Sequence, residues 1–346
     1  MHRGRGVAIF WCLAAAALFG ASTPASKALL PGLGPLSLAG LLYLGAAVAV
    51  LPFSFRGGSR ALRRRPRNIL MLLGAVIFGG GLGPVLLLLG LSRAPAASVA
   101  LWLNLETVAT AVLAFAFFRE HLDRKTWAAA FLVVAAGVLL AAPSGFGSAS
   151  GAVLVALACL CWGLDNNLTA LVDGFTPAQT TFVKGIVAGG ANLSLAFLIE
   201  GVDAAPARWA SALGVGALSY GVSIALYIRG AQHLGATRSQ ILFSTSPFLG
   251  SILAWTCLGE AVLPAQLAAA GVMLAALWLL LSARHEHDHA HDALLHTHDH
   301  RHDDGHHHHV HPGLPAGIRH THEHPHEPLA HAHPHEPDLH HRHDHD

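Results

Sequence analysis

Charged side chains are scarce in this chain of 346 residues, and their scarcity argues against an ordinary soluble protein. Only 12% of the residues are Asp, Glu, Lys or Arg, and 53% are hydrophobic, whereas soluble domains average about 25% charged residues. The imbalance is stronger before residue 283, because the last part of the chain is almost entirely polar. The net charge of +1 gives no reason to expect a nucleic-acid partner.

Cysteines are few, and the common catalytic motifs are missing. The four cysteines, Cys12, Cys159, Cys161 and Cys257, lie in apolar runs and form no disulfide framework. Cys159 and Cys161 would point to different sides of a helix, so they cannot share a metal ion. The glycine-rich stretch 79–84 lacks the strand-to-helix context of a dinucleotide site, and the sequence contains no phosphate loop, HExxH motif or nucleophilic triad. We therefore expect no enzyme.

Long apolar runs are what the chain has in abundance. Each is about 17–24 residues long, which is enough to cross a hydrocarbon core of about 30 Å as an α-helix. Helices are expected throughout, since lipid offers no hydrogen-bond partner to an open backbone. The sequence predicts an all-α polytopic protein with ten transmembrane helices in a lipid bilayer, over residues 6–29, 36–55, 69–91, 94–117, 126–142, 151–172, 176–199, 207–228, 236–258 and 261–282.

The positions of Lys and Arg predict which side of the membrane each loop faces. Basic residues gather in segments on the same side as the N-terminus, chiefly 56–67 and 119–125, whereas the opposite segments hold little more than Arg93 and Arg208. An excess of Lys and Arg marks the cytoplasmic side. We expect an inner or plasma membrane location with both termini in the cytoplasm, and we interpret the first apolar run as an uncleaved span.

The chain contains an internal repeat of five spans. The fifth and tenth spans each follow an acidic residue, Glu120 or Glu260, and the preceding segments NLETVATAVLAFAFFRE and STSPFLGSILAWTCLGE align at the same offset. An odd number of spans per repeat inserts the halves in opposite orientations, which is typical of transporters with a binding site near the midplane. We expect one repeat in residues 1–142, a second in 151–283 and a separate tail in 284–346.

These segments resemble the drug/metabolite transporter superfamily, in particular its ten-helix type built from two EamA-like repeats. The resemblance covers about residues 6–282 and rests on FGASTPASK, on the stretch from NLETV to GVLL, on CWGLDNNLTALV and on the stretch from GALSY to LGEAV. It implies a secondary transporter of small organic molecules such as amino acids, metabolites or drugs, often moved outward. Many relatives carry proline where this sequence has Thr107, whereas the second repeat keeps Pro247.

Four ionisable residues lie inside predicted spans, where a charge costs about 2.5–3.5 kcal/mol on insertion scales and therefore suggests function. Glu106, near the middle of the fourth span, is the strongest candidate for substrate or proton handling, with a structural ion pair or polar contact as the alternative. Lys27 lies toward a span end, where snorkelling to the interface is an equal alternative. For Asp165 and Lys184 the alternatives are helix–helix contacts and ion pairing.

Polar and aromatic residues inside the spans form a second group of candidates for the transport path. Hydrogen bonding to the helix backbone, packing or an interfacial location are the alternative roles for these side chains. Tyr220 and Tyr227 are seven residues apart and share one helix face, and Gln240 shares a face with Ser244. The complete group is Asn104, Asn166, Tyr220, Tyr227, Gln240, Ser244, Trp102 and Trp162.

Histidine dominates the tail after the last span. Residues 285–346 hold 24 of the 27 histidines and few large hydrophobic residues, so we expect the tail to be disordered. Neutral imidazoles suit Zn²⁺, Ni²⁺, Co²⁺ or Cu²⁺, and their affinity should fall below about pH 6 as they take up protons. The candidate ligands are His285, His287, His289, His291, His296, His298, His300, His302, His306, His307, His308 and His309. No other cofactor is expected.

Three functions are compatible with these features. The first is a secondary transporter of small organic molecules that works by alternating access. The second is a divalent-metal transporter that uses the tail as a collector or sensor, although the spans lack clustered metal ligands. The third is a membrane-bound metal buffer or sensor that transports nothing.

Overall fold

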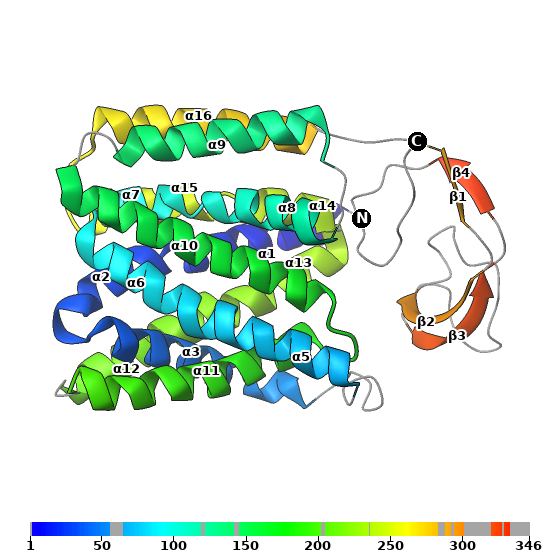
Figure 1. Ribbon diagram of the computed structural model, residues 1–346, viewed down its shortest axis with the longest axis horizontal. Coiled ribbons are helices and arrows are strands. Elements are labelled where there is room, and N and C mark those ends of the chain that lie inside the picture. The colour runs from blue at the N-terminus through cyan, green and yellow to red at the C-terminus, as the bar shows by residue number, and fades with distance from the viewer. Residues whose placement is uncertain are drawn as a thin grey trace. The chain divides into compact units, whose positions relative to one another are not determined.

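The computed structural model divides the chain into two compact units, Met1–Ala283 and Arg284–Asp346. The described residues are 2–55, 65–118, 122–141, 145–201, 205–234, 236–282, 288–291, 294–300, 320–326 and 329–332. In the first unit all of the described secondary structure is helical (Figure 1).

Eight helical segments among the described residues are long and apolar enough to span a membrane. Several of them consist of consecutive helices with different hydrogen-bond patterns. The segments are Gly6–Gly32 (α1, His2–Gly20; α2, Ser22–Leu29; η1, Leu30–Gly32), Pro35–Ser54 (α3), Pro66–Arg93 (α5, Pro66–Ala75; η2, Val76–Leu82; α6, Gly83–Arg93), Ala96–Phe117 (α7, Ala96–Trp102; α8, Leu105–Phe118), Arg124–Ala141 (α9), Ala149–Ala170 (within α10, Gly145–Ala170), Pro177–Ile199 (α11) and Pro206–Ala231 (α12, Pro206–Gly216; η4, Ala217–Val222; α13, Ser223–Leu234).

The last two predicted spans fall short of this length in the described chain. The ninth is divided into α14 (Ala236–Phe243) and α15 (Ser246–Cys257). The tenth is α16 (Pro264–Ser282), whose apolar part Pro264–Leu279 is a shorter helix. The described residues therefore contain eight candidate spans, whereas the sequence predicts ten.

Proline marks the beginning of many of these helices. The helices α3, α5, α11, α12 and α16 all start at a proline, whose missing N–H would have no partner in the first turn. The start of α11 also has a capping box. The Thr176 hydroxyl accepts from the Gln179 N–H at 3.3 Å, and the Gln179 side chain accepts from the Thr176 N–H at 3.0 Å.

Two of the predicted spans are interrupted near their middles. The interruptions lie at residues 103–104, between α7 and α8, and at 244–245, between α14 and α15. Pro247 follows the second interruption and cannot donate a helical hydrogen bond. In the first, the Leu101 carbonyl accepts from the Asn104 side-chain amide at 2.9 Å and from the Asn104 backbone N–H at 3.1 Å. Both spans are helical as predicted, and each is divided into two helices at these points.

The segments η2 and η4 have π-helical hydrogen bonding, and each lies between two α-helical parts of one span. A π-helix pairs each carbonyl with the amide five residues ahead, and such segments occur frequently at functional sites. The sequence of η2 is VIFGGGL, so three of its positions carry no side chain. Both segments therefore bring irregular backbone into the interior of the bundle.

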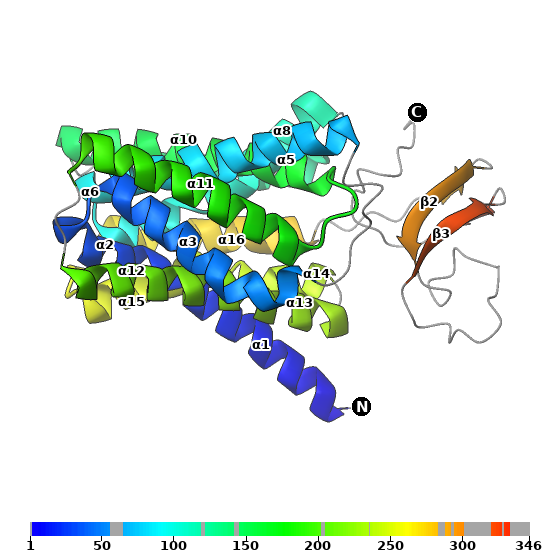
Figure 2. The same ribbon diagram turned by 90° about the horizontal axis from the view of Figure 1, so that it is seen from below.

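Helices from the two halves of the sequence pack against each other throughout the bundle. α3 packs on α11, α9 on α16 and α7 on α15. α1 packs on α13 and α15, while α10 packs on α6 and α8. Figure 1 shows α9 and α16 side by side along one edge, and Figure 2 shows α3 beside α11.

Glycines allow two of these crossings to become very close. Gly20 of α1 lies against the backbone of α15 at Ser246 and Gly250. Gly163 of α10 lies in the same way against the backbone of α8 at Thr110. A larger side chain at either glycine would overlap the backbone of the neighbouring helix.

The second unit contains short strands in its described residues. β1 (Asp288–His291) pairs antiparallel with β4 (Leu329–Ala332), and β2 (Leu294–His300) pairs antiparallel with β3 (His320–His326). The register of the second pair places His298 opposite His322. These strands differ from the expected absence of regular structure. Histidine alternates with other residues at the two-residue period that a strand also repeats.

Gly20→Ala should lower the free energy of unfolding by about 1–3 kcal/mol, because the added methyl group would overlap the backbone of α15. Gly190→Ala is the matched control, since its methyl group would meet no atom within 4 Å. Alanine also favours a helix over glycine by about 0.5–1 kcal/mol. Denaturant unfolding in detergent micelles, followed by circular dichroism, measures both variants. Equal losses in the two would contradict the close crossing.

Candidate substrate site

Glu106 lies in the first turn of α8, directly after the interruption of its span. Its Oε1 accepts a hydrogen bond from the Asn166 side-chain amide of α10 at 2.9 Å, and the same amide donates to Thr110 Oγ1 at 3.2 Å. The neighbouring Asn167 amide donates to the Thr110 carbonyl at 3.0 Å. A helix N-terminus favours negative charge. The carboxylate is therefore held by a neutral donor and a helix end.

A buried ion pair lies one residue along α10. Lys184 Nζ of α11 donates to both carboxylate oxygens of Asp165, at 2.6 and 2.8 Å. Thr169 Oγ1 donates to Asp165 at 2.9 Å and accepts from Lys184 at 3.3 Å. Asp165 is only 6% exposed. Both charges are therefore compensated inside the bundle, as buried ionic groups require.

The glycines of η2 connect this ion pair to the surrounding helices. The Gly79 carbonyl accepts hydrogen bonds from the Tyr43 hydroxyl at 2.5 Å and from Trp162 Nε1 at 2.9 Å. The Asn192 amide donates to the next two carbonyls of η2, at 3.3 Å each. A side chain at Gly79 would overlap the Asp165 carboxylate. Glycine here therefore allows the acid to approach the backbone of η2.

Five aromatic rings form a continuous row beside these groups. The ring centroids of Tyr43 and Tyr220 are 5.9 Å apart, and Phe19 lies 5.6 Å from Tyr220 in an edge-on arrangement. Phe243 lies 5.3 Å from Phe19 and 5.1 Å from Tyr227. These separations are typical of interacting aromatic pairs. The row joins α3, η4, α1, α14 and α13, which belong to both halves of the sequence.

Glu106 lies near both the ion pair and the aromatic row. Lys184 of α11, Tyr43 of α3 and Tyr220 of η4 are all within electrostatic range of its carboxylate. Glu106 is only half-buried, and its partner Asn166 is exposed. Elements from both halves of the sequence therefore contribute to the surroundings of this carboxylate. The cluster is a polar site between the two halves.

The structure places two predicted residues away from this cluster. The Trp102 side chain is buried, and its Nε1 donates to the Gly137 carbonyl of α9 at 3.0 Å. Lys27 Nζ donates to the carbonyls of Leu91 and Ala94, at 2.6 and 2.9 Å, at the C-terminal end of α6. A cation at a helix C-terminus satisfies its last carbonyls. Lys27 is therefore a helix cap.

Three further predicted residues form a small group at one end of the aromatic row. The Tyr227 hydroxyl donates to Gln240 Oε1 at 2.9 Å. The hydroxyl of Ser244, directly after α14, donates to the Gln240 carbonyl of that helix at 2.8 Å. Of the three, Tyr227 is itself a member of the row.

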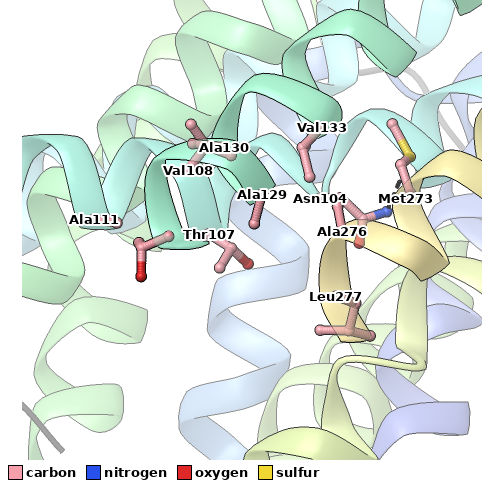
Figure 3. Close-up of a pocket in the computed structure, with 11 residues that line it drawn as sticks. Asn104, Thr107, Val108, Ala111, Ala129, Ala130, Val133, Met273, Ala276 and Leu277 are labelled. Carbon is pink, nitrogen blue, oxygen red and sulfur yellow. Dashed lines mark hydrogen bonds between the residues drawn. The ribbon is translucent and has the colours of Figure 1, made fainter. Parts of the chain in front are cut away.

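Asn104 faces a different cavity, which lies between the α7–α8 segment, α9 and α16 (Figure 3). Its amide lies 3.6 Å from Met273 Sδ. The cavity has a volume of about 40 Å³, and its polar lining includes Thr107 and Thr126. A volume of this size holds a few water molecules. Asn104 is thus separated from the polar site, although it is two residues from Glu106.

The predicted metal ligands divide into two sets. His285, His287, His302, His306, His307, His308 and His309 lie outside the described residues, while His289 and His291 fall in β1 and His296, His298 and His300 fall in β2. In the part of the chain searched for metal sites, no group of three or more His, Cys, Asp or Glu residues could hold a metal ion.

Sequence reasoning missed several residues of the site. Tyr43, Phe19, Thr110 and Thr169 all contribute contacts that were not expected. The chain has three tyrosines, and all three lie in the aromatic row. The scarcity of tyrosine is therefore a signal that could have identified Tyr43. Thr110 and Thr169 carry no comparable signal, because threonine is common in membrane helices.

The long apolar helices and their buried polar cluster define a multi-pass membrane protein. The model of the EamA-like transporter family matches residues 6–142 and 149–282. The chain belongs to this family, which is part of the drug/metabolite transporter superfamily and whose members are transporters and not enzymes.

Two comparisons accompany this match. An uncharacterized transporter of Methanothermobacter thermautotrophicus is 27% identical over 290 residues, which cover 78% of this chain and 84% of that protein. A crystal structure with 15% sequence identity superimposes with a TM-score of 0.57 over 79% of this chain and 96% of its own. At that identity the second comparison supports the fold alone.

Asp165→Asn should lower the free energy of unfolding by about 3–5 kcal/mol, because it leaves the Lys184 ammonium buried without its counter-charge. The double variant Asp165→Asn, Lys184→Met should recover most of this loss, since it removes both charges. Denaturant unfolding in detergent measures the coupling between the two positions. Strictly additive losses would show that the two side chains do not compensate each other.

Proposed function

We propose that this protein is a secondary active transporter that moves small organic molecules, most often outward, by alternating access around Glu106. The observation that carries the proposal is the position of this half-buried carboxylate at a helix interruption, between elements from both halves of the chain. An ionisable residue inside a membrane bundle marks a substrate or ion path. Interrupted helices near the midplane are the usual sites of substrate binding in transporters.

The proposal includes two inverted five-helix repeats, in residues 1–142 and 151–283, which together cross the membrane ten times. Matching features recur at an offset of about 140 residues in each half. The π-helical segments η2 and η4 correspond, and so do the interruptions at 103–104 and 244–245. The close crossing at Gly163 and Thr110 has its counterpart at Gly20 and Gly250. Such agreement is expected of a repeated unit and supports two halves that rock against each other.

The residues of the site have different proposed roles. Glu106, Asn166 and Thr110 form the polar surface that contacts the cargo, and the aromatic row supplies its apolar side. The ion pair of Asp165 and Lys184 positions α10 against α11 and does not contact the cargo, because both partners are occupied by each other. The cargo therefore meets one carboxylate, one amide and one hydroxyl.

The histidine-rich tail is proposed to bind divalent metal ions such as Zn²⁺, Ni²⁺, Co²⁺ or Cu²⁺ on the cytoplasmic side of the inner or plasma membrane. Its support is compositional, since 24 imidazoles lie within residues 285–346. We assign metal to the tail as a ligand and not as the cargo. The site around Glu106 contains a single carboxylate beside an amide and a hydroxyl, a set that suits organic groups.

Glu106→Gln should reduce cargo exchange in proteoliposomes by about tenfold to a hundredfold, as expected when a hydrogen bond to a charged group is lost. The assay screens a panel of amino acids, metabolites and divalent metal ions for counterflow. Thr107→Ala is the matched control, because this neighbouring residue faces the separate cavity. Full exchange by Glu106→Gln would refute the proposed site.

Deletion of residues 285–346 is the second arm of the same assay. Exchange of the organic cargo should be unchanged, because the EamA-like match ends at residue 282. Loss of metal exchange together with loss of metal binding would favour a metal transporter. Metal binding by the full-length protein without exchange of any compound would favour a metal buffer.

A further inference from the structure

The charges inside the described bundle do not balance around the site. Lys27 is occupied by the carbonyls at the end of α6. Asp165 and Lys184 neutralise each other as an ion pair. Glu106 has the neutral amide of Asn166 as its hydrogen-bond partner. Among the described side chains of the site, one negative charge is therefore left without a paired cation.

Two features of the surroundings of Glu106 favour an anion. The residue lies in the first turn of α8, where the helix dipole favours an anion. The amide of Asn166 is itself held by Thr110, so it fixes the direction of the carboxylate. In the interior of the bundle, away from the helix ends that face the loops, a carboxylate that served structure alone would be expected to have a cation beside it, as Asp165 has.

The aromatic row adds a second group that favours positive charge. Tyr43 and Tyr220 both lie within electrostatic range of Glu106, and the Tyr43 hydroxyl is held by its contact with the Gly79 carbonyl. Aromatic faces attract Lys, Arg and ligand ammonium groups when they lie within about 6 Å. The carboxylate and the rings would act together on one cation.

We infer that the cargo carries one positive charge and is an organic ammonium ion, which binds to Glu106 and against the faces of Tyr43 and Tyr220. This inference rests on the proposed function, since it assigns a chemical class to the cargo of the same site. A neutral cargo would leave the carboxylate unpaired, and an anionic cargo would be repelled by it.

Charged thiol reagents test the sign of the potential at the site. Thr110→Cys is introduced into a variant without native cysteines, and the rate at which its thiol reacts is measured with two methanethiosulfonates of similar size. One reagent carries a trimethylammonium group and the other a sulfonate. The ratio of the cation rate to the anion rate should fall about tenfold or more when Glu106→Gln is added, because one charge acts oppositely on the two reagents. Asp123→Asn, at the start of α9, is the control and should leave the ratio unchanged.

Protection of the same cysteine tests the cargo class. Choline, benzyltrimethylammonium and phenethylamine are added before labelling with N-ethylmaleimide, and 3,3-dimethylbutan-1-ol serves as the neutral isostere of choline. At least one cation should slow labelling several-fold with Glu106 and not with Glu106→Gln, and the neutral isostere should have no effect. A rate ratio independent of Glu106, or no protection by any of the cations, would overturn the inference. If Glu106→Gln still abolished exchange of another cargo, the transporter proposal would stand.

A different set of contacts closes one end of the bundle. Glu200 follows α11, and its carboxylate accepts from the backbone N–H groups of Leu36 and Ser37, at 2.8 and 3.0 Å, at the start of α3. Gly201 follows it with φ +65°, a left-handed conformation that favours glycine and turns the chain after the helix. A residue from the second half of the chain thus caps a helix of the first half.

Glu260 makes the same type of contact after α15. Its carboxylate accepts from the N–H groups of Ala96 and Ala97 at the start of α7, at 2.6 and 2.9 Å, and Gly259 precedes it with φ +67°. Ionised acceptors of this type form the stronger hydrogen bonds of proteins. Both contacts lie on the side that the distribution of Lys and Arg predicts to be external.

The geometry points to a paired latch, in which Glu200 and Glu260 hold the two halves together at the predicted outer end and must both release before the site opens to that side. The two contacts connect the halves at loops and not through the interior of the bundle, so they can separate without unfolding a helix. The latch depends on no feature of the cargo and is independent of its charge.

Cysteine accessibility tests the latch in proteoliposomes. Ser26→Cys, a buried position on α2, is labelled from outside with a membrane-impermeant maleimide in a variant without native cysteines. The double variant Glu200→Gln, Glu260→Gln should raise its labelling rate at least tenfold, with a smaller effect from each single change. Ala114→Cys, buried on α8, should remain unlabelled if the bundle has not loosened as a whole. Unchanged labelling at Ser26→Cys, or equal gains at both positions, would overturn the latch.

Discussion

Every backbone carbonyl and N–H group inside a bilayer must find its partner within the protein, and this requirement organises the interior of the bundle. It applies most strongly where the helices are irregular. The carbonyls of η2 accept from Tyr43, Trp162 and Asn192, and the interruption before α8 uses the amide of Asn104. Most of the polar side chains in the spans are thus committed to the backbone, and few remain for a cargo.

Glu106 differs from these side chains because its hydrogen bond is to another side chain and not to the backbone. Its carboxylate contacts an amide of another helix, whereas Lys27, Trp102 and Ser244 all bond to backbone carbonyls. The irregular segments whose carbonyls accept from polar side chains, η2 and the interruption before α8, also lie near this carboxylate. The requirement that backbone groups find partners inside the protein therefore accounts for the contacts around the site and for its location. It places irregular helical segments close to the point where a cargo would bind.

The sequence predicted much of the helical architecture, but it predicted few of the contacts between particular side chains. Hydropathy identified the apolar helices, and the default functional meaning of buried charge identified Glu106, Asp165 and Lys184 as candidates. The sequence could not reveal that Asp165 and Lys184 form one ion pair, because their contact depends on how α10 crosses α11. Nor could it reveal the interruption beside Glu106, since no proline marks it, whereas Pro247 does mark the corresponding place in the second half.

The sequence by itself determined that this is a helical membrane protein with an internal repeat, a charged interior and a histidine-rich tail. These are properties of composition and spacing, which each segment carries independently of the others. Only the tertiary structure decided that Lys27 caps a helix, that Tyr43 joins the site and that Glu200 and Glu260 connect the halves. The physical reason is that a polar side chain in a membrane bonds to whichever group a distant helix brings within about 3 Å, and that choice is made by helix packing.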